Sequence, residues 1–502
     1  MDEQQSTTKK LSLSALVLMI FTTIFGFGNT PAAFEQMGYG AILWYILGAI
    51  LFFIPAGLMF AEYGSTLKEA KGGIYSWLDA SIGEKWSFIA TFMWLASWLI
   101  WMVMISQKIW ITLSTIIWGH DTTGTWSLFG MGSTMTIGLL GILWIVFVTW
   151  AATRGLNTLA KVSSLGGIAI MALNVILLVA SAVILIANHG QLAQPIHHIS
   201  DFATSPSAQF QSPIAMISFV IYAIFAYGGL ESLGGITDSL DKPEKTFPKG
   251  IMIGGAVIGI GYSLAIFLWG ISANWQHVII DGKANLGNIT YVLMQNLGFE
   301  FGRAIGMSAA NASIIGTVFS RFAGLGMFFA YVGSFFVLSY SPLKSFILGS
   351  PKELWPKKMT TLNKNGMPAF SMWLQAAVVI AFIAGISILS AITHKESTFF
   401  YNVLTSMSNV STTLPYLFLV GAFPFFKAKK DLDRPFVAFH SHTWMITITA
   451  LVLLTVGIGI LFTILTPFIT GDVFTGMWTL AGPVVFGAIA WIFFARREKN
   501  NN

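Results

Sequence analysis

The chain of 502 residues contains no cysteine, and charged residues make up only 10% of it. Without cysteine it can form no disulfide bond, no thiolate metal site and no cysteine nucleophile. Soluble domains usually carry about 25% charged residues, so the low charged fraction excludes a water-soluble protein. Hydrophobic residues make up 55% of the chain, which is typical of a protein whose helices cross a membrane many times.

The apolar residues fall into stretches that are each long enough to cross a bilayer as a helix of about 20 residues. We therefore expect an all-α membrane protein with twelve transmembrane helices and no second, soluble domain in 1–502. The longest outer connection, 273–314, is expected to hold a short helix around the apolar run 289–297. The expected spans are 13–36, 40–66, 85–118, 133–153, 160–188, 211–238, 249–272, 315–346, 369–392, 399–426, 443–467 and 476–495.

The net charge of +6 is explained by where Lys and Arg lie relative to these spans. If the N-terminus is cytoplasmic, 21 of the 27 Lys and Arg residues lie in inner segments and three in outer ones. Positive residues flank membrane spans on the cytoplasmic side, so both termini are expected inside the cell. Nucleic-acid binding is then not needed to explain the excess of Lys and Arg, and no nucleic-acid recognition pattern is present.

Other function classes lack their usual sequence features. There is no Gly-x-x-x-x-Gly-Lys-Ser/Thr phosphate loop, so ATP hydrolysis of that type is not expected. The eight histidines fall in loops without metal-ligand spacing, and a membrane-embedded enzyme would need convergent catalytic groups that the spans do not supply. We predict no catalytic residue, metal or cofactor. Whether the outer histidines sense acid stays open, because histidine titrates near pH ~6.5.

Two of the expected spans are interrupted by glycine. The first is broken around 26–31 and the sixth around 227–235. Two interrupted spans at corresponding positions are typical of an inverted repeat whose broken helices form a substrate site near the bilayer centre. Glycines that only permit close helix packing are the alternative. The pairing of the two breaks favours a transporter.

The backbone freed at the two breaks suits a zwitterionic ligand. Around 26–28, N–H groups at the start of a half-helix attract a carboxylate. The carbonyls that end the preceding half-helix, and those at 225–227, suit a cation, so an α-amino acid is the expected substrate. The predicted substrate-binding residues are Thr23, Ile24, Gly26, Phe27, Gly28, Phe225, Ala226 and Tyr227.

Several short motifs follow one another along nearly the whole chain. They are GFG at 26–28, AEY at 61–63, GGIYSW at 72–77, Lys161, FAYGGLE at 225–231, DKPEK at 241–245 and LNKNGMP at 362–368. In this set the chain resembles the amino acid–polyamine–organocation (APC) superfamily of secondary transporters, nearest to its bacterial glutamate/γ-aminobutyrate antiporters. No single motif is specific, but the set is.

The resemblance implies a fold and several residue roles. Residues 12–210 and 211–426 would form inverted repeats of five helices each, with helices 1 and 6 broken, and 443–495 would add two helices. Residues 26–28 would receive the substrate carboxylate, and Phe225 would close over the substrate. Lys161 is similar to a lysine whose ammonium replaces the sodium ion of related symporters, although it could also be an ordinary positive residue at the inner edge.

Charged residues inside the spans call for a partner or a water-filled path, because a lone charge at the bilayer centre costs at least ~2.5 kcal/mol. Lys108 and Arg321 could bind an anionic group of the substrate or pair with Glu35. Glu231 either couples protonation or gating to transport, as the resemblance implies, or caps the broken sixth helix. Glu62 is expected to brace the loop with Gly72 and Gly73 as part of an inner gate.

The sequence also departs from the glutamate/γ-aminobutyrate antiporters, because 321–340 in the eighth span contains no acidic residue. We expect sodium-independent amino acid transport by alternating access across a bacterial cytoplasmic membrane. An amino acid/amine antiporter is the first reading, a proton-coupled symporter is the alternative, and a channel or membrane enzyme is a distant one. The expected partners are a small-molecule substrate, either an amino acid or an amine, and membrane lipid, with monomer and homodimer both open.

Overall fold

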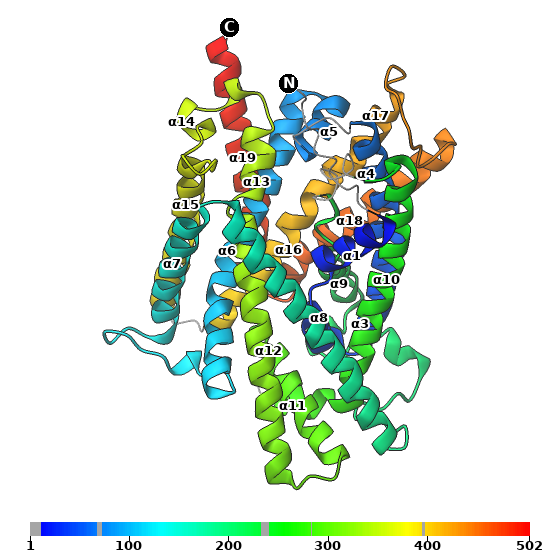
Figure 1. Ribbon diagram of the computed structural model, residues 1–502, viewed down its shortest axis with the longest axis vertical. Coiled ribbons are helices and arrows are strands. Elements are labelled where there is room, and N and C mark those ends of the chain that lie inside the picture. The colour runs from blue at the N-terminus through cyan, green and yellow to red at the C-terminus, as the bar shows by residue number, and fades with distance from the viewer. Residues whose placement is uncertain (1–11, 68–72, 232–239, 283, 394–396, 502) are drawn as a thin grey trace, which may run out of the picture.

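The computed structural model describes residues 12–67, 73–231, 240–282, 284–393 and 397–501, and most of them are helical. The long helices lie side by side along the long axis of the molecule (Figure 1). This arrangement agrees with the expected all-α membrane protein.

Ten helices of the described chain are long and apolar enough to cross a bilayer. The expected spans without a counterpart among these ten are the first and the sixth, which the sequence predicts to be broken. A broken helix leaves two short pieces, so neither reaches the length of a full span. The ten helices are the continuous run of α3 (Gly40–Gly48), η1 (Ala49–Phe53) and α4 (Ile54–Thr66), then α6 (Glu84–Trp118), α7 (Ser133–Ala152), α8 (Leu156–Ala187), α10 (Pro243–Ser272), α12 (Ala309–Leu338), α15 (Ala369–Thr393), α16 (Ser397–Gly421), α18 (His442–Ile469) and α19 (Val473–Asn501).

The first expected span consists of α1 (Leu13–Ile24) and α2 (Asn29–Met37), with four non-helical residues between them. Phe25 is extended, with φ −70° and ψ 100°, so the chain leaves the helix there. Pro31 lies in the first turn of α2, where its missing N–H costs no hydrogen bond. The predicted break at 26–28 is therefore confirmed.

The sixth expected span contains α9 (Pro213–Ala226), which is only 14 residues long. Ser212 caps its start by accepting a hydrogen bond from the N–H of Ala215. After Ala226 the chain turns, and Gly229 takes φ +108°, a conformation that side-chain-bearing residues rarely adopt. The second break thus lies where the sequence predicts it, and 232–239 lies outside the described residues.

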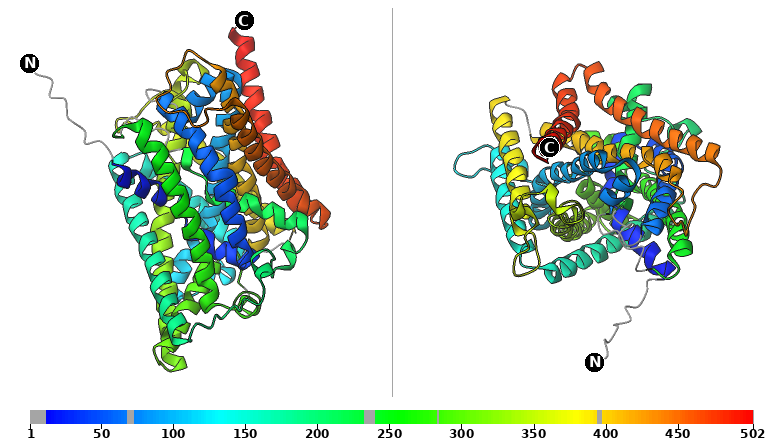
Figure 2. Two further views of the ribbon diagram at one scale, coloured as in Figure 1. Left: turned by 90° about the vertical axis from the view of Figure 1, so that its right-hand side faces the viewer. Right: turned by 90° about the horizontal axis from the view of Figure 1, so that it is seen from above.

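Shorter helices cover the two ends of the bundle. At one end are α5 (Ile74–Ile82), α13 (Ser341–Leu343), α14 (Lys357–Thr360) and α17 (Phe423–Ala428), and at the other is α11 (Ile289–Ala304). The predicted short helix around 289–297 is therefore confirmed as the first part of α11. Seen end-on in Figure 2, α7 and α15 form one edge of the bundle and α18 runs along another.

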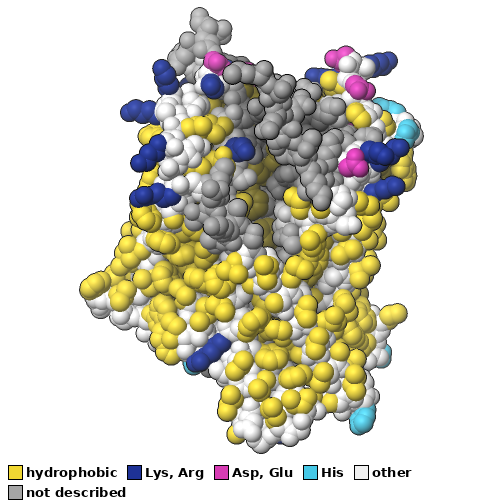
Figure 3. All heavy atoms as spheres, in the orientation of Figure 1, with side chains coloured by type: hydrophobic (Ala, Val, Ile, Leu, Met, Phe, Trp, Pro, Cys, Tyr) yellow, Lys and Arg dark blue, Asp and Glu magenta, His cyan; other side chains and the backbone are white. Residues whose placement is uncertain are grey.

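The surface divides into an apolar body and a basic end. Figure 3 shows most Lys and Arg gathered toward the end that carries α5, α14 and the C-terminus, whereas hydrophobic side chains cover most of the rest of this face. Large apolar side chains such as Ile168 (66% exposed) and Leu454 (59% exposed) point outward from the long helices. Such a surface is unfavourable in water and favourable against lipid.

Candidate functional site

A cavity of about 810 Å³ lies where the two helix breaks meet the long helices α6, α8, α12 and α16. Seven of the eight predicted substrate-binding residues line it: Thr23, Ile24, Gly26, Phe27, Gly28, Phe225 and Ala226. Tyr227 does not line it. Its side chain is fully buried, and its hydroxyl donates to the carbonyl of Tyr45 at 2.8 Å. The structure therefore places Tyr227 in the packing behind the second break.

The first break presents backbone N–H groups to this cavity. Asn29 and Thr30 donate their N–H groups to the carbonyls of Gly26 and Phe27, closing the start of α2. The N–H groups of Phe27 and Gly28 have no partner among the described residues. Both residues line the cavity, and the start of a helix attracts negative charge. The break can therefore receive a carboxylate.

Tyr262 of α10 joins the two breaks through one hydroxyl group. Its oxygen accepts hydrogen bonds from the N–H of Gly26 at 3.0 Å and from Nδ2 of Asn29 at 3.2 Å. The same hydroxyl lies 2.9 Å from the carbonyls of both Ile24 and Ala226. One hydroxyl hydrogen can serve only one of these carbonyls at a time. The sequence analysis missed Tyr262, because nothing in its apolar surroundings distinguishes it from a packing residue.

Glu231 is buried beside the second break, with 2% of its surface exposed. Its carboxylate accepts hydrogen bonds from Tyr416 OH at 2.8 Å, the N–H of Gly229 at 3.1 Å and Nε1 of Trp94 at 3.2 Å. All three donors are neutral, and no ion pair with Glu231 forms among the residues that the structure describes. Trp94 also lines the cavity, so it connects the carboxylate to the space beside the breaks.

Polar side chains on one face of α16 also line the cavity. Thr405, Asn409 and Thr412 are spaced four and three residues apart, which brings them to the same side of a helix. Oδ1 of Asn409 and Oγ1 of Thr412 are buried without a hydrogen-bond partner in the described structure. Unsatisfied buried polar atoms are costly unless something binds them. Their helical spacing within an apolar span was the sequence signal that could have found them.

Lys108 of α6 lines the cavity with only 6% of its surface exposed. Its ammonium donates to the carbonyl of Leu286 at 3.1 Å and lies 5.4 Å from the centre of the Tyr401 ring. It forms no ion pair with Glu35 within 4 Å. The predicted Lys108–Glu35 pair is therefore absent from the described residues.

Arg321 lies on the exposed side of α12 and does not line the cavity. Its guanidinium donates to the carbonyl of Ile117 near the end of α6, at 3.0 Å. Of the two cations predicted as alternatives for binding an anionic group, the structure brings only Lys108 to the cavity. The side chain of Lys161, in the second turn of α8, lies outside the described residues.

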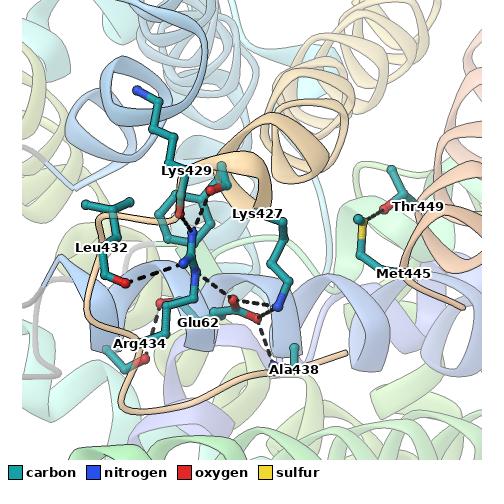
Figure 4. A network of polar contacts seen from close by, with 10 residues as sticks. Glu62, Lys427, Lys429, Leu432, Arg434, Ala438, Met445 and Thr449 are labelled. Atoms are coloured by element: carbon teal, nitrogen blue, oxygen red, sulfur yellow. Dashed lines mark hydrogen bonds and ion pairs between the residues drawn. The ribbon is translucent and has the colours of Figure 1, made fainter. Parts of the chain in front are cut away.

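Glu62 is fully buried near the basic end of the bundle and is shared by two cations (Figure 4). Lys427 lies 3.0 Å and Arg434 3.4 Å from its Oε1, and the N–H of Ala438 donates to its Oε2 at 2.8 Å. These partners belong to α17 and the segment between α17 and α18. The structure thus joins Glu62 to this segment. Of the two glycines that Glu62 is predicted to brace, Gly72 lies outside the described residues, and the hydrogen bonds and ion pairs of the Glu62 side chain within the described part of the chain do not include Gly73.

Known proteins resemble the chain over most of its length. The amino acid permease family model matches residues 11–489. The inner membrane transporter YjeM of Salmonella typhimurium is 50% identical over 489 residues, 97% of this chain and 96% of that protein. The aspartate/glutamate permease AcaP of Lactococcus lactis is 25% identical over 426 residues, 83% and 79% of the two chains. A glutamate/γ-aminobutyrate antiporter of L. lactis is 22% identical over 435 residues, 85% and 78% of the two chains.

Proposed function

The chain belongs to the amino acid permease family within the APC superfamily, and from this premise we propose that it moves amino acids across the inner membrane by alternating access. The family is one of transporters, and the ten apolar helices make this chain a multi-pass inner membrane protein like its relatives. Its substrates are small molecules, namely amino acids or amines.

The observation that carries the proposal is the meeting of the two helix breaks at one cavity. The N–H groups of Phe27 and Gly28 are oriented for a substrate carboxylate by the start of α2. Tyr262 can donate to only one of the carbonyls of Ile24 and Ala226, which leaves the other for the substrate ammonium. The two charges of an α-amino acid therefore match the two kinds of backbone group at the breaks.

We propose further that 12–210 and 211–426 are inverted repeats and that 443–495 adds two helices, giving twelve spans. The breaks in the first and sixth spans support this arrangement, because each break then has the same position in its own repeat. The Lys and Arg distribution supports termini on the cytoplasmic side.

For the transport mode, we propose amino acid/amine antiport without sodium, with proton-coupled symport as the alternative. The similarity to a glutamate/γ-aminobutyrate antiporter supports exchange. The similarity of Lys161 to a lysine that replaces the sodium ion of related symporters supports sodium independence. The symport alternative has a specific observation in its favour. Glu231 is a buried carboxylate held by neutral donors, and such a group can take up a proton without leaving a buried cation unpaired.

The test is uptake by the purified full-length protein in proteoliposomes, screened over amino acids and amines. We expect saturable uptake that accelerates when amino acid or amine is loaded inside, and that does not depend on a sodium gradient. Uptake that requires sodium would remove the role proposed for Lys161. Uptake driven by a proton gradient without internal substrate would support symport instead. A chemically altered product would indicate an enzyme, and non-saturating flux would indicate a channel.

A further inference from the structure

The cavity contains one charged side chain among its described lining residues, the ammonium of Lys108. The other lining side chains are apolar, aromatic or neutral polar. Lys108 and the helix start at Phe27 and Gly28 therefore make this part of the cavity positive before the substrate enters, whereas the Glu231 carboxylate lies behind the lining at the second break. A zwitterion has no net charge and would leave the Lys108 charge uncompensated.

The contacts of Lys108 do not neutralise it. An ammonium has three N–H donors, and the carbonyl of Leu286 takes one of them. The Tyr401 ring lies within the range of a cation–π contact, which is weaker than an ion pair. By contrast, Lys427 and Arg434, which lie nearer the end of the bundle, share the carboxylate of Glu62. Lys108 is more deeply buried than either of these side chains and forms no ion pair among the described residues.

Lys108 and the first break both lie near the segment 286–290. Leu286, whose carbonyl accepts from Lys108, lies four residues before Thr290, in the turn that precedes α11. Oγ1 of Thr290 is buried without a partner in the described structure, and it would lie 3.9 Å from a Cβ placed on Gly28. The segment 286–290 thus contacts the Lys108 ammonium at Leu286 and brings the unsatisfied hydroxyl of Thr290 close to Gly28.

We propose that Lys108 binds the side-chain carboxylate of an acidic amino acid, while the N–H groups of Phe27 and Gly28 bind the α-carboxylate. This inference rests on the proposed transport function and specifies its substrate class. An acidic amino acid carries a net charge of −1, so it compensates the Lys108 charge that a neutral amino acid leaves unbalanced. Lys108 is then the residue that determines preference for aspartate and glutamate over asparagine and glutamine.

The experiment measures uptake of glutamate, glutamine, aspartate and asparagine by the full-length protein in proteoliposomes. Each acid and its amide have nearly the same shape, so their kcat/KM ratio isolates the charge. We expect the wild-type protein to prefer the acids by about tenfold or more, which is typical of a contact with a charged group. In Lys108→Gln the ratio should fall by a similar factor, mainly through KM for the acids, and Lys108→Arg should restore part of it.

Arg321→Gln is the matched control, because it removes a cation from a transmembrane helix at a position outside the cavity. Its acid/amide ratio should equal that of the wild-type protein. Stabilisation of the wild-type protein against thermal unfolding should be greater with glutamate than with glutamine, and this measurement needs no variant. Equal stabilisation by the two ligands, or an unchanged ratio in Lys108→Gln, would overturn the inference and leave amino acid transport standing. No uptake or binding of any amino acid would overturn the proposed function as well.

Discussion

The hydroxyl of Tyr262 contacts four polar groups from the two helix breaks. A phenylalanine at this position would keep the packing of the ring and lose only these polar contacts. The ring stacks on Phe25 with 4.5 Å between the centroids, and Tyr262→Phe keeps that contact. It leaves Asn29 and the N–H of Gly26 without their acceptor. An unsatisfied buried group costs ~1–3 kcal/mol, so we expect kcat/KM for amino acid uptake to fall by about tenfold or more.

Tyr45→Phe is a close control for this variant. Tyr45 is also fully buried, and its ring lies 4.8 Å from that of Tyr262, but its hydroxyl has no hydrogen-bond partner in the described structure. We expect Tyr45→Phe to transport like the wild-type protein. Similar uptake kinetics for the two variants would show that the Tyr262 hydroxyl does not organise the site.

Glu231 is the residue whose protonation can be tested by a change of one atom. Glu231→Gln keeps the size and one acceptor oxygen but removes the negative charge, so the side chain can no longer bind a proton. If Glu231 couples protons to transport, the uptake rate of this variant should lose the pH dependence of the wild-type rate. A wild-type pH profile in Glu231→Gln would assign the pH dependence to other groups, such as the outer histidines.

At the scale of single residues, the sequence predicted the backbone part of the site and missed much of its side-chain part. The breaks follow from local glycine content, so Gly26, Gly28 and their neighbours could be identified without knowing which helices pack together. Tyr262 and Asn409 belong to helices far along the chain, and their roles depend on contacts that only the fold creates. The same reason explains why Tyr227, next to a break in sequence, lies outside the cavity.

Among the helices, the Glu62 cluster joins α4 to the segment that links α17 and α18. Glu62→Gln would leave Lys427 and Arg434 partly buried without a counter-charge, and breaking a buried pair typically costs ~3–5 kcal/mol. We expect a clearly lower thermal unfolding temperature in detergent. We also expect faster tryptic cleavage at the exposed Lys429 and Lys430, because the segment loses its attachment to α4.

Glu84→Gln is the control for Glu62→Gln, because it removes an ion pair that is more exposed to solvent. Glu84 pairs with Arg497 at 2.7 Å, but 41% of its side chain is exposed, so its loss should cost only ~0–1 kcal/mol. If the Glu62→Gln protein is as stable and as resistant to trypsin as the Glu84→Gln protein, the Glu62 cluster does not hold the segment between α17 and α18 against α4.

The long helices could be predicted from the sequence, whereas the contacts between distant elements could not. Ten of the expected spans correspond to long helices because apolar length alone specifies them. The Glu62 contact could not be predicted in the same way, because ion pairing links α4 to residues more than 360 positions later. The sequence therefore suggested that Glu62 contacts the nearby loop with Gly72 and Gly73, whereas the structure pairs it with Lys427 and Arg434.

At the scale of the whole molecule, the uneven distribution of Lys and Arg predicts the orientation in the membrane. The chain contains no cysteine, so one introduced cysteine is its only thiol and labelling needs no background correction. Gln191 follows α8 at the end expected outside, and Lys430 lies between α17 and α18 at the end expected inside. Both residues are exposed.

In intact cells, a membrane-impermeant maleimide should label Gln191→Cys and should label Lys430→Cys only after permeabilisation. The reverse pattern would invert the proposed topology, and labelling of both in intact cells would contradict an odd number of spans between them. Because α4 and α17 lie at the basic end, the expected pattern would also place Glu62, Lys427 and Arg434 on the cytoplasmic side of the cavity.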